Sequence, residues 1–243
     1  MDILYIVIPA YNEEETIHQV LEQWYPVVEK HDGGGKSRLV VVDDGSRDRT
    51  HEILTEYAEE KPLLVPLTKE NGGHGAAVLF GYRYSISQGA DYIFQTDSDG
   101  QTLPEEFEQF WKNRKSYEMV IGSRKGRQDG ISRVLVTRTL KLVIRACFHV
   151  SVTDANTPYR LMKTKVLEET MQLIPEDFNL SNVMISVIYA RQKRPVLYLP
   201  ITFRPRQGGV NSINLKKIFK IGIRAVRDFR EINRKLEVSA KKG

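Results

Sequence analysis

Three apolar segments of the sequence each run directly into a cluster of acidic residues. They read ILYIVIPAYNEEE (3–15), RLVVVDDGSRDRT (38–50) and DYIFQTDSDGQ (91–101). Apolar residues at helical spacing follow each segment, so short buried strands alternate with helices. This alternation predicts an α/β fold, a mostly parallel twisted sheet flanked by helices on both faces. Because ligands bind at the carboxyl ends of such strands, we expect the three acidic clusters to share one rim.

Further strands are predicted at LLVPL (63–67), YEMVIGSR (117–124) and RPVLYLPITF (194–203). With 41% hydrophobic and 28% charged residues, the 243-residue chain suits one α/β domain of generous size. The single cysteine, Cys147, excludes an internal disulfide framework and fits a reducing compartment. We expect neither a signal peptide nor a membrane span, hence a soluble or peripheral protein. The net charge of +5 is mild, and we expect no nucleic-acid partner.

Asp97 and Asp99 end the third apolar segment and are separated by one serine. Residues i and i+2 of an extended segment point to the same side, so the two carboxylates converge. They either share a hard divalent cation, Mg²⁺ or Mn²⁺, or belong to an ordinary Asp-Gly turn. Gln101 lies two residues further along and could supply a third oxygen ligand. The presence of two more acidic clusters favours the cation.

Six motifs, in this order, resemble those of family 2 glycosyltransferases with the GT-A nucleotide-sugar-binding fold. They are VIPAYNEEETI, VVDDGSRDRT, NGGHGAA, DYIFQTDSDGQ, VIGSR and DANTPYRLM. Within that family the chain is most similar to the polyprenyl-phosphate (dolichol-phosphate) glycosyltransferases, over roughly residues 1–215. The resemblance implies a catalytic domain over 1–212, with a nucleotide-binding part (1–125) and an acceptor- and sugar-binding part (126–212). C-terminal amphipathic helices, a basic tail over 213–243, would follow.

The resemblance also implies an activity and a set of site residues. The enzyme would move a sugar from a GDP- or UDP-sugar to a polyprenyl phosphate and invert the anomeric centre. Catalytic residues Asp97 and Asp99, with Gln101, would hold the cation, which neutralises charge on the leaving nucleoside diphosphate. The residues implied for the nucleotide-sugar are Pro9, Ala10, Tyr11, Glu13, Asp43, Asp44, Gly73, Ser98 and Arg206.

Several of these residues have a second interpretation. Asp44 is a reasonable acceptor for a ring N–H of the base and Tyr11 a stacking face, but DDGS (43–46) could simply leave the strand and cap the next helix. Both interpretations can hold together. In NGGHG (71–75), glycines allow close approach of a ligand and the helix start favours anions. His74 in this loop is either a substrate contact or a surface residue.

Three residues are implied for the acceptor phosphate. In the polyprenyl-phosphate enzymes, a Gly-(Ser/Thr)-Arg arginine and an Arg-x-x-x-Ser pair bind it, and here Arg124, Arg133 and Thr137 match these positions. Arginine suits phosphate because it donates two parallel hydrogen bonds. The alternative is an amphipathic helix with solvated arginines. A phosphate needs no protein base. Related enzymes with hydroxyl acceptors use a carboxylate base, and the corresponding stretch here, DFNLSNVMISVIYARQ (177–192), carries only Asp177.

The last part of the chain points toward a membrane. Arg206 and Ser212 resemble a segment that would close over the donor diphosphate, with Gly208 and Gly209 as hinges. From 213 onward, large apolar residues and basic residues follow helical spacing, as in a helix that lies in a membrane interface or packs on the domain. We therefore expect a peripheral protein at the cytoplasmic face of the membrane. A homo-oligomer or a membrane-protein partner is compatible with this expectation.

Three other functions remain as alternatives. The first is transfer to a glycan or another hydroxyl acceptor. Sugar-phosphate nucleotidyltransfer is disfavoured, because the first strand runs into PAYNEEE (9–15) rather than a glycine-rich triphosphate loop. A non-catalytic nucleotide-sugar-binding subunit would have little use for an intact pair of cation ligands.

Overall fold

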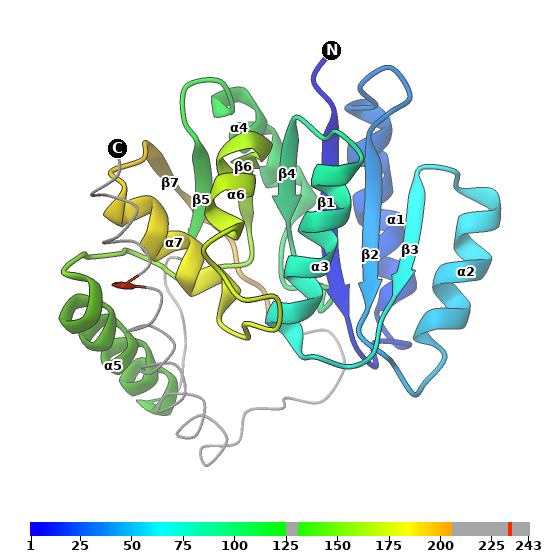
Figure 1. Ribbon diagram of the computed structural model, residues 1–243. Coiled ribbons are helices and arrows are strands. Elements are labelled where there is room, and N and C mark those ends of the chain that lie inside the picture. The colour runs from blue at the N-terminus through cyan, green and yellow to red at the C-terminus, as the bar shows by residue number, and fades with distance from the viewer. Residues whose placement is uncertain (125–130, 206–232, 235–243) are drawn as a thin grey trace.

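The protein is described by a computed structural model that covers residues 1–124, 131–205 and 233–234, with the backbone alone for 131–139 (Figure 1). Arg206, Ser212, the two hinge glycines and nearly all of the tail expected over 213–243 lie outside these residues. So do the side chains of Arg133 and Thr137. Within the described residues, every helix falls short of the length or the apolar character that crossing a bilayer requires.

Seven strands of the described chain form one sheet in the order β3-β2-β1-β4-β6-β5-β7. Their bounds are β1 Leu4–Ala10, β2 Arg38–Asp43, β3 Leu64–Thr68, β4 Tyr92–Gln95, β5 Met119–Arg124, β6 Arg160–Lys163 and β7 Val196–Ile201. β6 runs antiparallel to β4 and β5, and all other neighbours are parallel. The expected mostly parallel sheet is confirmed, and strands from both expected parts, 1–125 and 126–212, join it.

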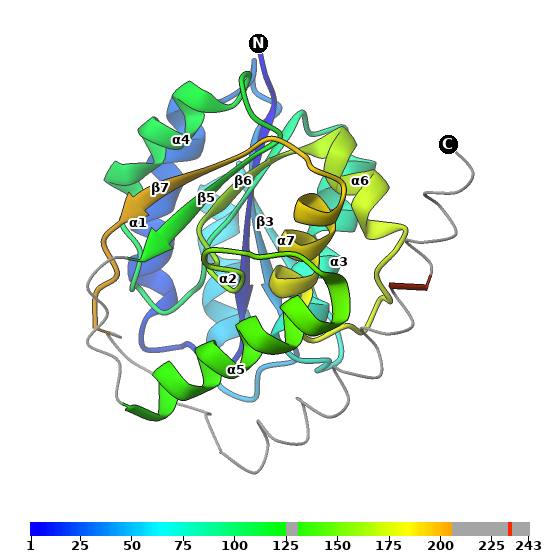
Figure 2. The same cartoon turned by 90° about the vertical axis from the view of Figure 1, so that its left-hand side faces the viewer.

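Helices cover both faces of the sheet. Their bounds are α1 Ile17–Lys30, α2 Thr50–Glu60, α3 His74–Ser87, η1 Pro104–Glu106 (a 3-10 turn), α4 Phe107–Asn113, α5 Ile131–Phe148, α6 Thr164–Met171 and α7 Ser181–Arg191. Figure 2 shows α1 and α4 on one side of the sheet and α3, α6 and α7 on the other. The helices predicted after the three acidic clusters are present, the third one preceded by η1.

The residues of β1 explain the two layers. Leu4, Ile6 and Ile8 enter the core under α1 and α4, whereas Tyr5 and Val7 enter the core under α3. This alternation is the period of a strand buried on both faces. The acidic residues begin where each strand ends, so the fold brings them to one edge of the sheet.

Candidate active site

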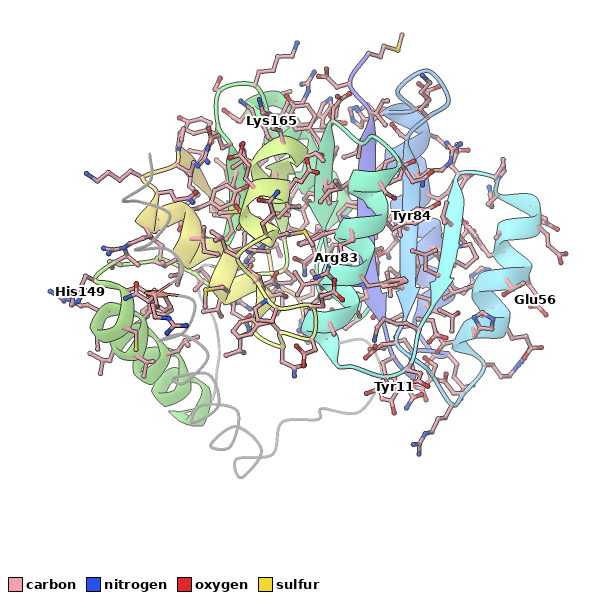
Figure 3. The ribbon with its side chains drawn as sticks, viewed as in Figure 1. Tyr11, Glu56, Arg83, Tyr84, His149 and Lys165 are labelled. Atoms are coloured by element: carbon pink, nitrogen blue, oxygen red, sulfur yellow. The ribbon has the colours of Figure 1, made fainter. Side chains whose placement is uncertain are left out.

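A cavity of about 660 Å³ opens at the carboxyl ends of β1, β2 and β4. Its walls are residues 9–15 after β1, Asp44 and Asp48 after β2, four residues of the loop and first turn of α3, and residues 97–99 after β4. The three acidic clusters therefore meet at one rim, as the sequence predicts. Figure 3 shows Tyr11 at this edge of the sheet.

Most residues implied for the donor lie together in this cavity. The lining includes Pro9, Ala10, Tyr11, Glu13, Asp44, Gly73, Asp97, Ser98 and Asp99. Asp43, Gln101 and Arg124 are not part of the lining. Tyr11 is 42% exposed, an unusual state for a large aromatic ring. Its exposed face is suited to stacking on a flat ligand.

Asp97 is paired with a histidine from the glycine-rich loop. His74 Nε2 lies 2.9 Å from Asp97 Oδ1, and the imidazole is half-exposed. Burial alone would lower the pKa of His74, but the neighbouring Asp97 carboxylate, with Asp99 and Asp44 further away, raises it. A raised pKa favours the imidazolium, which would donate a hydrogen bond to Asp97. This contact was not predicted from the sequence.

The loop from Thr96 to Thr102 is held on several sides. The two threonine hydroxyls are 2.6 Å apart, and the Gln101 N–H donates to Asp99 Oδ1 at 3.1 Å. Gly100 between them has a positive φ of 68°. The segment is thus an Asp-Gly turn, and its carboxylates still face the cavity. The turn and the cation site proposed as alternatives are therefore geometrically compatible.

The two carboxylates suit a cation that is shared with a substrate. Within the described residues, no group of three or more His, Cys, Asp or Glu side chains is arranged to hold a metal ion. Asp97 and Asp99 both line the cavity, so a cation beside them would have room for oxygens of a diphosphate and for water. Mg²⁺ typically binds in this way, through one or two carboxylates plus substrate phosphates. The two carboxylates therefore fit the divalent cation expected from the sequence.

Asp44 organises the loop before α3. Its side chain is buried, and Oδ1 accepts hydrogen bonds from Lys69 Nζ at 2.8 Å and from Gly72 N at 3.0 Å. Oδ2 accepts one from Gly73 N at 2.7 Å. Both oxygens thus already accept hydrogen bonds from the protein, and a ring N–H of a base would be an additional donor to one of these oxygens. Asp44 still lines the cavity, so its proposed contact with a base stays a prediction.

The other acids after β2 hold backbone. Asp43 is buried, and its Oδ1 accepts from Ser46 N at 2.9 Å. Asp48 Oδ1 accepts from Thr50 N, the first residue of α2, and Oδ2 accepts from Glu14 N at 3.1 Å. Although partial burial alone would raise it, hydrogen bonds from Thr50 and Glu14 lower the pKa of Asp48. Asp48 therefore joins the loop after β1 to the start of α2.

The glycines of NGGHG have a packing role. Gly73 has a φ of 88°, and a Cβ there would stand 2.5 Å from Asn179 Oδ1. A Cβ on Gly75 would lie 2.4 Å from the carbonyl oxygens of Phe178 and Asn179. The start of α3 therefore packs directly on the loop before α7. Close approach is required here, as expected, but the observed neighbours are the Asn179 side chain and the backbone of Phe178 and Asn179.

Arg124, at the end of β5, is engaged in an ion pair. Its Nε and Nη2 donate to the two oxygens of Asp154 at 2.9 and 2.7 Å, and the ring centroid of Phe203 lies 5.2 Å from the guanidinium. The arginine side chain is only 8% exposed. Nη1 is not used in the pair. Asp154, the first residue of the motif DANTPYRLM, thus braces Arg124.

Arg160 is completely buried and has a bracing role as well. Its guanidinium donates to the carbonyl oxygens of Ala155, Thr157 and Asn182, at distances between 2.6 and 3.2 Å. These bonds tie the loop before β6 to the first turn of α7. Arg160 therefore braces the loop before β6.

Comparison with known proteins gives a family and two groups of relatives. A family model described as Glycosyl transferase family 2 matches residues 5–171. The undecaprenyl-phosphate 4-deoxy-4-formamido-L-arabinose transferase of Pectobacterium atrosepticum is 28% identical over 77% of this chain and 60% of the relative. The protein of the same name from Pseudomonas syringae pv. syringae is 30% identical over 67% of this chain and 48% of the relative. The chain thus spans about half to three-fifths of these curated relatives.

Solved structures share the fold. Glucosyl-3-phosphoglycerate synthase from Mycobacterium tuberculosis, in complex with Mn²⁺ and uridine-diphosphate-glucose, superposes with a TM-score of 0.65 at 17% identity. The match covers 95% of this chain and 79% of that one. S. aureus TarS 1-349 superposes with a TM-score of 0.57 at 18% identity, covering 84% and 60%. At these identities the likeness concerns the fold, and it confirms the GT-A class expected from the sequence.

Proposed function

The chain belongs to glycosyl transferase family 2, and we propose that it transfers a sugar from a nucleoside diphosphate to a polyprenyl phosphate, with inversion of the anomeric centre. The observation that carries this proposal is the convergence of Asp97, Asp99, Asp44 and Tyr11 in one cavity. Carboxylates for a cation and an exposed ring for a base thus lie within one donor-sized site. The names of the curated relatives support a lipid phosphate as the acceptor.

The donor would bind across the ends of β1, β2 and β4. Tyr11 would stack on the base, while Asp44 would accept a ring N–H beside the loop that it already holds. Pro9, Ala10, Glu13, Gly73 and Ser98 would line the ribose and diphosphate. Asp43 would act through the loop after β2, because its side chain is not part of the cavity lining and accepts from Ser46 N. Residues 1–125 would thus form the donor half, and 126–212 the acceptor half with Arg206 near the diphosphate.

Asp97 and Asp99, with Gln101 beside them, would hold Mg²⁺ or Mn²⁺, which supplies charge neutralisation to the leaving nucleoside diphosphate. Mn²⁺ is present in the complex of the M. tuberculosis synthase. His74 orients Asp97 through the 2.9 Å contact.

The reaction needs little acid–base chemistry from the protein. An oxygen of the acceptor phosphate attacks the anomeric carbon, and the bond from that carbon to the diphosphate breaks. A phosphate monoester is already ionised near neutral pH, so no protein base has to remove a proton. Arg124, Arg133 and Thr137 would hold this phosphate. Arg124 would donate through Nη1, while Nε and Nη2 stay on Asp154.

A lipid acceptor implies work at a membrane surface, and we place the protein peripherally at the cytoplasmic face. The described part of α5 offers one suitable surface. Leu142 is 68% exposed, and the exposed Lys141 and Arg145 lie beside it on the helix. A basic helix with an exposed large apolar residue suits the interface of an anionic bilayer.

A panel assay tests the proposal. Purified protein is incubated with UDP- and GDP-sugars and Mn²⁺, with either polyprenyl phosphate or soluble glycans as acceptor. We expect a lipid-linked sugar with one nucleotide series only, and no product in excess chelator. Transfer only to soluble glycans would indicate a hydroxyl acceptor, and nucleotide binding without any transfer would indicate a non-catalytic subunit.

A further inference from the structure

Residues Thr202–Arg204, which directly follow β7, touch both halves of the proposed site. We call them the β7 strap. The N–H of Arg204 donates to the carbonyl of Gln101 at 2.8 Å, and Gln101 Nε2 donates back to the carbonyl of Arg204 at 2.7 Å. Phe203, the middle residue of the strap, packs its ring on the guanidinium of Arg124. One three-residue segment thus joins the Asp97–Asp99 loop to the arginine expected at the acceptor phosphate.

The strap decides how the Gln101 amide is oriented. A backbone carbonyl can only accept, so the amide group that faces Arg204 must be the NH₂. The amide oxygen of Gln101 is therefore turned away from the strap. The backbone N–H of the same residue donates to Asp99 Oδ1 at 3.1 Å. Gln101 thus connects the strap to one of the two carboxylates at the cavity.

On the acceptor side, the strap covers one face of Arg124. The guanidinium lies 5.2 Å from the ring centroid of Phe203, within the range of a cation–π contact. Asp154 accepts hydrogen bonds from two nitrogens along the edge of the guanidinium. The arginine is therefore fixed by a stacking contact and an in-plane ion pair, and loss of either would let the side chain change rotamer.

The strap itself is anchored to a rigid part of the fold. The N–H of Thr202 lies 3.0 and 3.1 Å from the two carboxylate oxygens of Glu106, at the end of η1. The same turn is tied to the core, because the Tyr159 hydroxyl donates to the Leu103 carbonyl at 2.8 Å. Tyr159 is fully buried, with its ring against Phe94 and Phe110.

We propose that the β7 strap is a positioning element that sets the cation half and the acceptor half of the site relative to each other. Arg204 orients Gln101 beside Asp99, Phe203 orients Arg124, and Glu106 fixes the strap on which both depend. None of the three needs to touch a substrate. The inference rests on the proposed function. It adds the residues that hold the cation half and the acceptor half of the site in a fixed relative position.

The test uses the full chain and two separate readouts. Calorimetry measures the affinity for Mn²⁺ in the presence of whichever of UDP and GDP the unmodified protein binds, and kinetics measures the KM for polyprenyl phosphate. Glu106→Ala removes the acceptor of the Thr202 N–H, so we expect weaker Mn²⁺ binding and a higher KM together, each by about fivefold to tenfold. Glu105→Ala, the exposed neighbouring acid, should change neither.

Two further variants test the cation side and the acceptor side of the strap separately. Gln101→Ala should weaken Mn²⁺ binding and leave the KM for polyprenyl phosphate unchanged. Phe203→Leu should raise that KM by at least about threefold, because it removes the cation–π contact with the covered Arg124 guanidinium, and leave Mn²⁺ binding unchanged. If Glu106→Ala does not fold, as judged by its melting temperature, Glu106→Gln is measured by the same criteria with smaller shifts expected.

The outcomes are distinguishable from failure of the proposed function. Unmodified protein that binds no Mn²⁺ with nucleotide and transfers no sugar would overturn the proposed function itself. The strap proposal would be overturned if the unmodified protein is active but a folded Glu106 variant does not change both the Mn²⁺ affinity and the KM for polyprenyl phosphate.

Discussion

Arg124 and Asp154 form a two-point ion pair in which Nε and Nη2 of the arginine lie 2.9 and 2.7 Å from the two carboxylate oxygens. The pair joins the end of β5 to the loop before β6, and both side chains are more than four-fifths covered. Charges this far from water are costly when one partner is lost. The same arginine is the one expected at the acceptor phosphate, so its support is part of the site.

The first prediction concerns this pair. Asp154→Ala should lower the free energy of unfolding by on the order of 3 kcal/mol, because Arg124 would keep its charge without its partner. Urea unfolding measures the loss. Lys30→Ala is the matched control, since Lys30 pairs with Glu108 but is 65% exposed, and such pairs contribute below about 1 kcal/mol. Equal losses in the two variants would show that the Arg124 pair is no more than a surface contact.

The second prediction concerns the carboxylates at the end of β4. Asp97 and Asp99 repel each other without a cation, so Mn²⁺ should raise the melting temperature of the protein. At a hundredfold excess over its Kd, a ligand stabilises the folded state by about 2.7 kcal/mol. Asp99→Asn should fold normally and lose both this stabilisation and turnover. An undiminished thermal shift in Asp99→Asn, or full activity in excess chelator, would contradict the cation assignment.

The third prediction separates two roles of Asp44. Asp44→Ala should weaken nucleoside diphosphate binding by about 1–3 kcal/mol and partly retain the stabilisation by Mn²⁺. It should also destabilise the fold, because Gly72 and Gly73 lose their acceptor. Lys69→Met is the matched control, since it removes the ion pair of the same carboxylate, together with the bond from Lys69 Nζ to the Glu70 carbonyl, and keeps the acceptor of Gly72 and Gly73. If Asp44→Ala changes stability alone and nucleotide affinity stays intact, its role is confined to the loop.

The fourth prediction concerns pH. The pKa of Asp48 is lowered in the folded protein, so its contribution to stability is present above the unfolded value of about 3.9 and is lost as pH falls through the folded pKa. Asp48→Ala should cost about 1 kcal/mol at pH 7, as loss of a helix-start acceptor does. Unfolding at pH 7 and near pH 3 should show this difference shrinking. A constant difference would mean that ionisation of Asp48 is irrelevant.

The sequence predicted the sheet because its strands are continuous apolar runs, and β1 and β2 are buried almost throughout. It did not predict β6. The segment RLMK has no apolar alternation, and it pairs as a strand because Arg160 is satisfied by carbonyls from elsewhere in the fold. A buried arginine of this kind cannot be told from a surface one by local pattern.

The site was predictable in its location and less so in its contacts. Strand ends followed by acids place Asp44, Asp97 and Asp99 at one rim in any parallel sheet. The partners of these acids come from distant loops, as in Asp44 with Lys69 or Asp97 with His74. Gln101 and Arg204 are 103 residues apart. No residue spacing encodes such pairs, since they depend on how the loops pack.

One lipid, with and without its terminal phosphate, tests the central claim most directly. Polyprenyl phosphate and the corresponding polyprenol differ only in the group that would attack the anomeric carbon. With Mn²⁺ and the preferred nucleotide-sugar, we expect kcat/KM for the phosphate to exceed that for the alcohol by at least about a thousandfold, since an alcohol offers the site no phosphate oxygens and has to lose a proton to attack. Comparable rates with the two lipids, or product formation on a soluble glycan alone, would contradict a phosphate acceptor.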